Sequence, residues 1–236
     1  KPKSSVSESF RALRSNLNFF TGHESNKVFM ITSSISGEGK TFTTINLATV
    51  FALSGRRTLI IGADMRRPKI YMDFNMSNQT GLSGFLSNLS TFDEIIQKTS
   101  IQNLDLVSGG PVPPNPSELL LTARFDEFMK EAKSRYDFVL IDTPPLALVT
   151  DAFVMAKFAD HTVFVMRQNY TPKAFIRSID DYYYSGKFKN ISILLNDIYR
   201  SGFGYGYGYG GYGYGYSYGY AGYGYSRKND GGYYSD

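Results

Sequence analysis

The chain has 236 residues, of which 42% are hydrophobic and 19% charged, and its formal net charge is +4. It contains no cysteine, which excludes disulfides and thiol chemistry, and no apolar run approaches the ~20 residues that a membrane-spanning helix needs. Lys and Arg never occur five in a row, so no nucleic-acid partner is expected, and the start at Lys1 predicts a soluble piece of a longer protein.

The first predicted element is an amphipathic helix over residues 5–20. A capping box, Ser5-Val-Ser-Glu8, opens this segment, and its apolar face consists of Phe10, Leu13, Leu17 and Phe20. The charged residues Glu8, Arg11 and Arg14 lie beside that face. Taken alone, this pattern is typical of an ordinary solvated helix face with a local Glu8 to Arg11 pair.

Apolar runs and helix-like stretches alternate along the chain as far as residue 200. The runs lie at 27–32, 58–61, 104–107, 138–141, 162–165 and 191–195, and the helix-like stretches at 41–54, 82–98, 117–133, 150–159 and 172–184. Several runs lack alternation of apolar and polar residues, which is typical of strands covered on both faces. We therefore predict one α/β domain over 1–200, a mostly parallel sheet wrapped by helices, with a rigid proline-rich loop at 109–116.

The composition changes abruptly after Arg200. Residues 201–236 consist mainly of Gly, Tyr and Ser, and they hold twelve of the 19 tyrosines. With so few aliphatic residues this segment is predicted to be a flexible tail, so core packing cannot be the purpose of its tyrosines. Their hydroxyls are candidate phosphate acceptors: Tyr205, Tyr207, Tyr209, Tyr212, Tyr214, Tyr216, Tyr218, Tyr220, Tyr223, Tyr225, Tyr233 and Tyr234.

A glycine-rich loop, residues 34–41, lies between the first apolar run and the helix that follows it. Phosphate binding at such a loop needs glycines that let backbone N–H groups point inward, a lysine for the outer phosphates, and a hydroxyl for Mg²⁺. The loop supplies all of these, although Ser34 stands where the strict pattern has glycine. The predicted ATP site consists of Ser36, Gly37, Glu38, Gly39, Lys40, Thr41 and Phe42.

Two carboxylates follow apolar runs and are candidates for the same site. Asp142 ends the run at 138–141, before an abrupt Thr-Pro-Pro break, and Asp64 follows the run at 58–61. Open α/β sheets gather ligands at the carboxyl ends of their strands, so both residues are expected near the loop. A lone Asp in such a place can also be a helix cap or turn former. Its pairing with the phosphate loop favours Mg²⁺ binding by Asp142.

Six segments together resemble the bacterial tyrosine kinases. The glycine loop, Leu59-Ile-Ile-Gly-Ala-Asp-Met-Arg-Arg-Pro68 and Leu-Ile-Asp-Thr-Pro-Pro are similar to the Walker A, Walker A′ and Walker B motifs of that family. The other three are Glu8-Ser-Phe-Arg11-Ala-Leu-Arg14, the loop Pro113-Pro-Asn-Pro-Ser-Glu-Leu-Leu120 and the C-terminal tyrosine cluster. The resemblance spans the whole chain, and the six segments are specific only in combination.

The resemblance implies a P-loop NTPase-like kinase domain on the cytoplasmic side of the bacterial inner membrane. The implied activity is phosphorylation of its own tail tyrosines with ATP and Mg²⁺, in the regulation of exopolysaccharide or capsule synthesis and export. The implied catalytic residues are Lys40, Asp64 and Asp142, and the implied metal ligands are Thr41, Asp64 and Asp142.

The resemblance also implies partners. The chain is expected to form a homo-oligomeric ring, an octamer, in which Glu8, Arg11 and Arg14 make the contacts and one subunit's tail enters the next subunit's site. Further implied partners are a membrane-embedded remainder or activator of the same system and a tyrosine phosphatase.

The chain departs from the family pattern at Gly62, because the family's second motif commonly carries two aspartates and only Asp64 remains here. The identity of the base that accepts the tyrosine proton is therefore undecided, and Asp64 is a candidate for orienting the acceptor as well as the metal.

Arg66 and Arg67 fit either neutralisation of phosphate charge or an ordinary charged surface. Asn196, at the end of the last run, is predicted to touch the adenine ring.

Other functions fit the sequence less well than this one. No His-Arg-Asp or Asp-Phe-Gly element accompanies the loop, which excludes a eukaryotic-type protein kinase, and the isolated His23 and His161 are interpreted as structural. An alternative is an ATPase switch of the partition or positioning type, with the tail as a binding segment. A third hypothesis, a low-complexity adhesive that stacks on RNA bases or on itself, is disfavoured because Arg and Lys are scarce in the tail.

Overall fold

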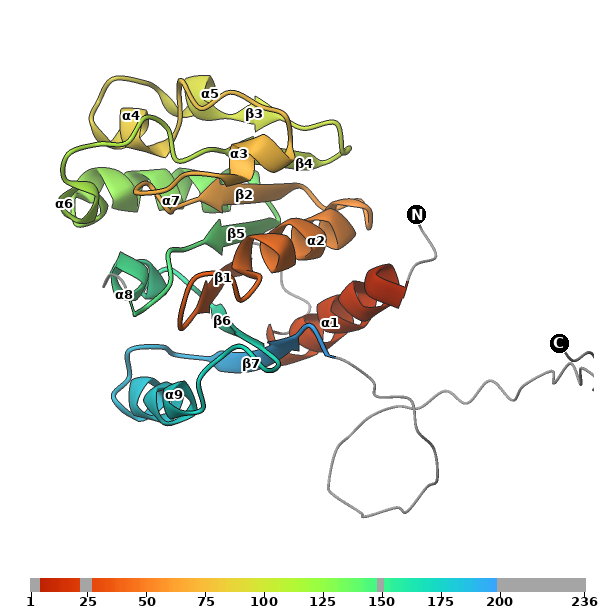
Figure 1. Cartoon of the computed structure of the whole chain (residues 1–236). Helices are drawn as coiled ribbons and strands as arrows, with labels where there is room; N and C mark the ends of the chain where they lie inside the picture. The colour runs from red at the N-terminus through yellow and green to blue at the C-terminus, as the bar shows by residue number, and fades with distance from the viewer. Residues whose placement is uncertain (1–4, 22–26, 148–150, 199–236) are drawn as a thin grey trace, which may run out of the picture. The chain divides into compact units, whose positions relative to one another are not determined.

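The computed structural model describes residues 5–21, 27–147 and 151–198, and a seven-stranded sheet forms the centre of this part of the chain (Figure 1). The strands are β1 Lys27–Ser33, β2 Thr58–Gly62, β3 Gln97–Lys98, β4 Leu104–Val107, β5 Phe138–Asp142, β6 His161–Arg167 and β7 Ile191–Asn196. Their order is β3-β4-β2-β5-β1-β6-β7, and every neighbouring pair is parallel except β3 with β4. The prediction of a mostly parallel α/β sheet is confirmed.

Helices cover both faces of this sheet. They are α1 Ser5–Thr21, α2 Lys40–Ala52, α3 Ile70–Asp73, α4 Leu82–Leu86, α5 Phe92–Ile95, α6 Pro116–Leu120, α7 Ala123–Arg135, α8 Asp151–Ala156 and α9 Ala174–Tyr184. Alternate residues of β1 belong to different cores, because successive side chains of a strand point to opposite faces. Phe29 and Ile31 join the core under α1, α2 and α3, whereas Val28 and Met30 join the core formed with α4 to α9.

An aromatic stack fixes α2 on the sheet. The Phe51 ring of α2 lies 4.1 Å from the Phe138 ring of β5 and 5.5 Å from the Phe29 ring of β1, centroid to centroid. Aromatic pairs of this kind contribute about 0.5–1.5 kcal/mol beyond their buried area. The stack therefore joins the three elements that carry the glycine loop and Asp142.

The strand register brings the loop and the predicted carboxylates to one edge of the sheet. Strand β5 lies between β1 and β2, and Asp142 pairs with Ile31 on one side and with Gly62 on the other. Because all three strands are parallel, their carboxyl ends open on the same side, where α/β sheets bind ligands.

Two predicted helices are wrong in extent. The stretch 82–98 is divided into α4, α5 and β3, because Asn88 adopts a left-handed backbone (φ 58°) and Thr91 with Glu94 forms a capping box that starts a new helix. The stretch 117–133 is divided into α6 and α7, since Thr122 is extended (φ −77°, ψ 153°). Apolar periodicity alone could not reveal these breaks.

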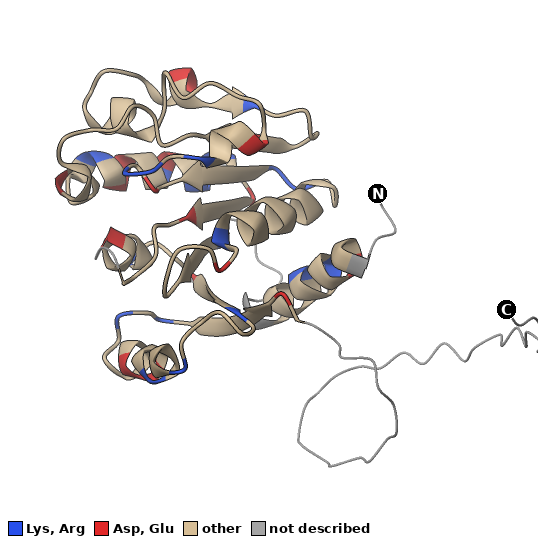
Figure 2. Ribbon diagram, viewed as in Figure 1, with Lys and Arg blue, Asp and Glu red and all other residues tan. Residues whose placement is uncertain are grey.

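In the part of the chain that the structure describes, no helix has the length and apolar character needed to cross a membrane. Basic and acidic residues are spread over many helices and loops of the ribbon (Figure 2).

Candidate active site

The glycine loop connects the end of β1 with the start of α2 and is shaped for an anion. Gly37 and Gly39 have φ values of 86° and 98°, a left-handed region that other residues enter only at a cost. Among the described residues, the backbone N–H groups of Gly37, Gly39 and Lys40 have no hydrogen-bond partner. Free N–H groups at the start of a helix, together with its dipole, favour phosphate binding.

Lys40, the first residue of α2, is buried at the base of this loop. Its Nζ donates a hydrogen bond to Ser33 Oγ at 2.9 Å. Burial lowers the pKa of Lys40 below its ordinary value of 10.5, and this effect is opposed by the negative charges of Asp142, Glu38 and Asp64. A bound polyanion would favour the charged lysine, so the site is suited to phosphate.

Asp142 is buried at the carboxyl end of β5. Its Oδ2 accepts a hydrogen bond from Thr41 Oγ1 at 2.8 Å, and its Oδ1 accepts one from Thr44 Oγ1 at 3.3 Å. Burial raises the pKa of Asp142 to about 6, against the hydrogen bond from Thr41 and the charge of Lys40. A buried carboxylate in this condition favours a cation as partner.

The oxygen atoms present fit Mg²⁺. This cation binds one or two protein carboxylates and completes its shell with waters and substrate phosphates. Asp142 and Thr41 already place a carboxylate and a hydroxyl at one point beside the loop. Within the described ranges no three His, Asp or Glu side chains gather into a metal-binding group, so phosphate oxygens would be needed to complete the shell.

Asp64 lies in the turn after β2 and faces the same space. Its Oδ1 accepts a hydrogen bond from the backbone N–H of Arg67 at 3.0 Å, which fixes the turn.

Arg66 and Arg67, the two arginines of this segment, have different surroundings. Arg66 bonds to Asp151 and to Ser117, joining the turn to α8 and α6, whereas Arg67 lines the cleft. For Arg66 the structure shows a contact that neither interpretation from the sequence included, whereas phosphate neutralisation by Arg67 remains a prediction.

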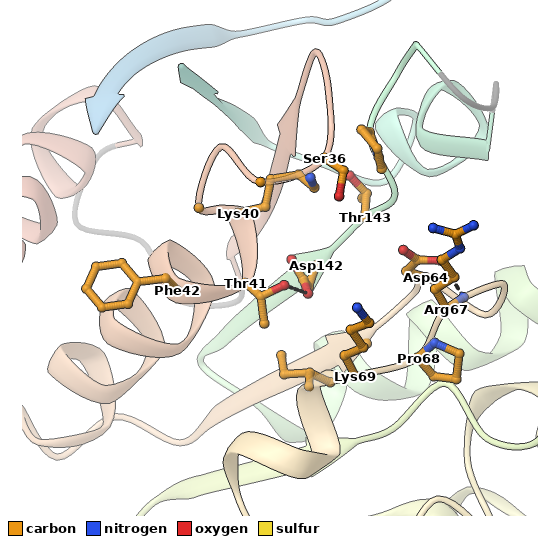
Figure 3. Close-up of a pocket in the computed structure, with 15 residues that line it drawn as sticks. Ser36, Lys40, Thr41, Phe42, Asp64, Arg67, Pro68, Lys69, Asp142 and Thr143 are labelled. Carbon is orange, nitrogen blue, oxygen red and sulfur yellow. Dashed lines mark hydrogen bonds between the residues drawn. The ribbon is translucent and has the colours of Figure 1, made fainter. Parts of the chain in front are cut away.

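A cleft of about 290 Å³ unites these groups (Figure 3). The predicted residues that line it are Ser36, Gly37, Gly39, Lys40, Thr41, Phe42, Asp64 and Asp142. Figure 3 shows the Phe42 ring turned away from Asp142. That ring packs edge-on against Phe10 of α1 at a centroid distance of 5.9 Å.

Glu38 does not line the cleft, although it was predicted in the ATP site. Its side chain is fully buried and turns back into the loop, where it accepts a hydrogen bond from Ile35 N at 2.8 Å and another from the Thr171 hydroxyl. A buried carboxylate needs such donors. Glu38 therefore shapes the loop from behind.

A group of residues, of which the sequence indicated only Asn196, supports the loop from the side of β6 and β7. Arg167 Nη1 donates to Gly37 O at 3.2 Å, and the Tyr170 hydroxyl donates to Ser36 O at 3.0 Å. We call Arg167, Tyr170, Thr171 and Asn196 the brace. No motif marks Arg167, Tyr170 or Thr171, and the only signal for them in the sequence is that they follow the apolar run at 162–165, at the carboxyl end of a predicted strand.

Asn196 ends β7 as predicted, but its amide is engaged by the loop. Its Nδ2 donates to Glu38 O at 3.0 Å, and a Cβ placed on Gly39 would lie 2.2 Å from the same nitrogen. Asn196 also lines an apolar groove with Phe10, Leu13 and Phe42. A contact with an adenine ring remains a prediction.

The three residues predicted at an oligomer interface make contacts within the chain. Arg11 pairs with Glu8 one turn away on α1, and Arg14 Nη1 donates to Val50 O of α2 at 2.8 Å. The local Glu8 to Arg11 pair is the one considered for an ordinary helix face. An oligomeric role of these residues remains a proposal.

His161 is buried, and its Nε2 lies 2.8 Å from Ser192 Oγ. Burial lowers the pKa of His161, which agrees with a neutral structural residue. His23 and all twelve candidate acceptor tyrosines, Tyr205 to Tyr234, lie outside the described residues.

Comparison with known proteins gives the class and then the family. Residues 26–172 match the family model described as an AAA domain. The septum site-determining protein MinD of Pyrococcus horikoshii, solved with Mg-ADP, has a TM-score of 0.58 at 19% identity and covers 72% of this chain and 69% of its own. With the glycine loop and the sheet order, this defines the fold class as a P-loop NTPase.

Nearer relatives are more specific. Putative tyrosine-protein kinase CapB of Staphylococcus aureus is 42% identical over 166 residues, which are 70% of this chain and 73% of CapB. The solved kinase domain of Escherichia coli tyrosine kinase ETK has a TM-score of 0.80 at 35% identity and covers 89% of this chain and 83% of that domain. The chain belongs to the bacterial tyrosine-protein kinases. It matches only 23% of the length of the complete etk sequence from Escherichia coli K12.

Proposed function

We propose that this chain is the catalytic domain of a protein-tyrosine kinase that transfers the γ-phosphoryl group of ATP, with Mg²⁺, to tyrosines of its own C-terminal cluster. The observation that carries the proposal is the meeting of Lys40, Thr41 and Asp142 at a glycine loop, in a chain that holds twelve tyrosines after Arg200. An ATPase switch needs the same cleft but not the tyrosines. The similarity to MinD concerns the fold alone.

The chemistry needs positioning and charge neutralisation more than covalent help from the protein. A bond forms between the phenolic oxygen and the γ-phosphorus, the bond from that phosphorus to the bridging oxygen of ADP breaks, and the phenolic proton leaves. Lys40 and the loop N–H groups would hold the phosphates. Asp142 and Thr41 would hold Mg²⁺, which neutralises phosphate charge when bound. Asp64, in the opposite wall of the cleft, would orient the acceptor hydroxyl and take its proton.

Intact mass of the purified full chain tests this proposal directly. The dephosphorylated wild type should gain whole phosphate groups on incubation with ATP and Mg²⁺, mapped by fragmentation to Tyr205–Tyr234. Lys40→Met and Asp142→Asn should gain none while retaining the wild-type circular dichroism spectrum, because they remove phosphate and metal contacts. Hydrolysis of ATP without any gain in mass would instead favour the ATPase switch.

We also propose that transfer occurs in trans within a homo-oligomeric ring, an octamer by family resemblance, with Glu8, Arg11 and Arg14 at its contacts. Each phosphotyrosine adds about −1.5 to −2 charges, so about three cancel the net charge of +4 and would drive tails from neighbouring sites. Light scattering should give the mass of a ring for the dephosphorylated chain and a smaller mass for the phosphorylated chain. Arg11→Ala is the cleaner interface variant, because Arg14 also ties α1 to α2.

The surroundings of this system are part of the same proposal. The ring would work on the cytoplasmic side of the bacterial inner membrane, with a membrane-embedded remainder or activator, and a tyrosine phosphatase would reset it. Regulation of exopolysaccharide or capsule synthesis and export is the corresponding cellular role. Deletion of the gene, followed by complementation with the Lys40→Met variant, tests it: capsule restored to the wild-type amount by the variant would contradict a role for the kinase activity.

A further inference from the structure

The wall of the cleft opposite the brace has no carboxylate at the end of β2. Gly62 lines the cleft and is the register partner of Asp142 on the neighbouring strand β5. A Cβ placed on Gly62 would lie 2.7 Å from Ile70 Cγ2, and Ile70 is almost fully buried. No side chain therefore fits at position 62 unless Ile70 moves. The first residue of α3 occupies that space.

The same packing brings Lys69 into the cleft, because Lys69 immediately precedes Ile70. Lys69 lines the cleft and is exposed, and within the described part of the chain its ammonium group makes no hydrogen bond or ion pair. Figure 3 shows its side chain rising into the space between Asp142 and Asp64. An ammonium group in this position is available to a ligand.

The charges of the cleft favour an anion as that ligand. Three cationic side chains, of Lys40, Arg67 and Lys69, line it together with two carboxylates, of Asp64 and Asp142. Lys40 is held at the loop by Ser33, and Figure 3 shows the Arg67 guanidinium extending beyond Asp64. Lys69 is thus the cation that the opposite wall directs toward the space in front of the loop.

We infer that Lys69 is a second phosphate-binding lysine, which contacts the γ-phosphoryl group of ATP from the wall opposite Lys40. The inference rests on the proposed function, since it takes ATP as the phosphoryl donor. Charge on the transferred group is spread over its equatorial oxygens in the transition state, so cations on two sides stabilise it better than one. Lys40 would hold the phosphate chain at the loop, and Lys69 would approach only its outermost group.

Nucleotide affinity separates this role from a general effect of charge. We would measure binding of ADP and of a non-hydrolysable ATP analogue, both with Mg²⁺, to Lys69→Met, Lys69→Gln and Lys69→Arg. A lost charge-assisted hydrogen bond should weaken binding of the analogue about tenfold, and binding of ADP less than about twofold. Lys69→Arg should retain most of the preference for the analogue. Lys130→Met is the matched control, because Lys130 is an exposed lysine on α7, outside the cleft.

An equal loss for both nucleotides, or no loss for either, overturns the inference. Melting temperatures of all variants should stay at the wild-type value, because the Lys69 side chain is exposed; if Lys69→Met is unstable, Lys69→Gln provides the comparison. Tyrosine transfer should fall at least tenfold in Lys69→Met with saturating ATP. If wild type binds nucleotides but labels no tyrosine, the proposed function fails, whereas the affinity comparison still decides whether Lys69 contacts the γ-phosphate.

Discussion

The brace behind the glycine loop and the wall of the cleft in front of it differ in their contacts with the loop. On the side of β6 and β7, Arg167, Tyr170 and Asn196 all donate hydrogen bonds to backbone carbonyls of the loop. On the side of β2 and α3, the charged residues Asp64, Arg67 and Lys69 line the cleft, and within the described residues none of them bonds to the loop. The brace holds the loop in shape, and the wall formed by β2 and α3 leaves its charges available to ligands.

This difference has a physical reason. A loop whose N–H groups must remain free for phosphate has its carbonyls as the remaining attachment points, and the brace uses three of them. The opposite wall cannot support the loop in the same way without closing the space that the acceptor must enter. Changes in the brace should therefore affect nucleotide binding and stability together, and changes in the opposite wall should affect transfer with little effect on stability.

The largest effect is expected from Gly39→Ala, which would bring the loop into collision with the brace. The backbone has φ 98°, and the new Cβ would lie 2.2 Å from Asn196 Nδ2. Backbone strain of about 1–3 kcal/mol should lower the free energy of unfolding, and displacement of the Asn196 amide from the loop should in addition weaken nucleotide affinity by at least about tenfold. Isothermal titration with ATP analogue and Mg²⁺ measures this.

Gly55→Ala is the matched control for that substitution. Gly55 has φ 83°, but a Cβ there would meet nothing within 4 Å. It should lower the melting temperature through strain alone and leave affinity unchanged. Equal affinities of the two variants would show that the contact between Asn196 and the loop at Gly39 does not influence nucleotide binding.

The next effect concerns Asp142, which lines the cleft at the end of β5, between β1 and β2. Because burial raises the pKa of Asp142 from 3.8 to about 6, the folded protein holds this proton more tightly than the unfolded chain. The free energy of unfolding should fall as the pH rises through this window and stay lower above it, by at most about 3 kcal/mol. Asp142→Asn should therefore be more stable than wild type at pH 7.5, although it loses transfer.

Denaturation in urea across the pH range from 4 to 8 tests this expectation for the nucleotide-free protein. The stability gap between Asp142→Asn and wild type should narrow as the pH falls below 6. Asp73→Asn, at an exposed position on α3, controls for the loss of a surface charge. A gap that is independent of pH would mean that burial of the Asp142 charge does not limit stability.

The smallest effect is expected from Tyr170→Phe, which removes one hydrogen bond of the brace and keeps the ring. Net contributions of single hydrogen bonds are about 0.5–1.5 kcal/mol, so affinity for nucleotide should fall about two- to tenfold. Tyr183→Phe is a close control, because Tyr183 and Tyr170 are 51% and 47% exposed and only Tyr170 touches the loop. If both variants bind as wild type does, Arg167 and Asn196 suffice to hold the loop.

The sequence by itself determined the fold class and the half of the cleft that local geometry dictates. Gly37 and Gly39 indicate left-handed backbone, Lys40 and Thr41 come directly after them, and the apolar run before Asp142 indicates a buried strand that ends at this carboxylate. These features depend on neighbouring residues in the chain, so spacing and residue type are enough. The catalytic and metal-binding roles of these residues remain predictions.

Only the tertiary structure decided which distant side chains complete the site. Tyr170 and Asn196 reach the loop from 134 and 158 positions away, and sequence spacing carries no information about contacts that depend on strand order and register. The same holds for the different surroundings of Arg66 and Arg67, adjacent residues of which one bonds to Asp151 and the other lines the cleft. At Gly62 the sequence showed the absence of a carboxylate, but the packing of Ile70 into that space, with Lys69 beside it, required the folded chain.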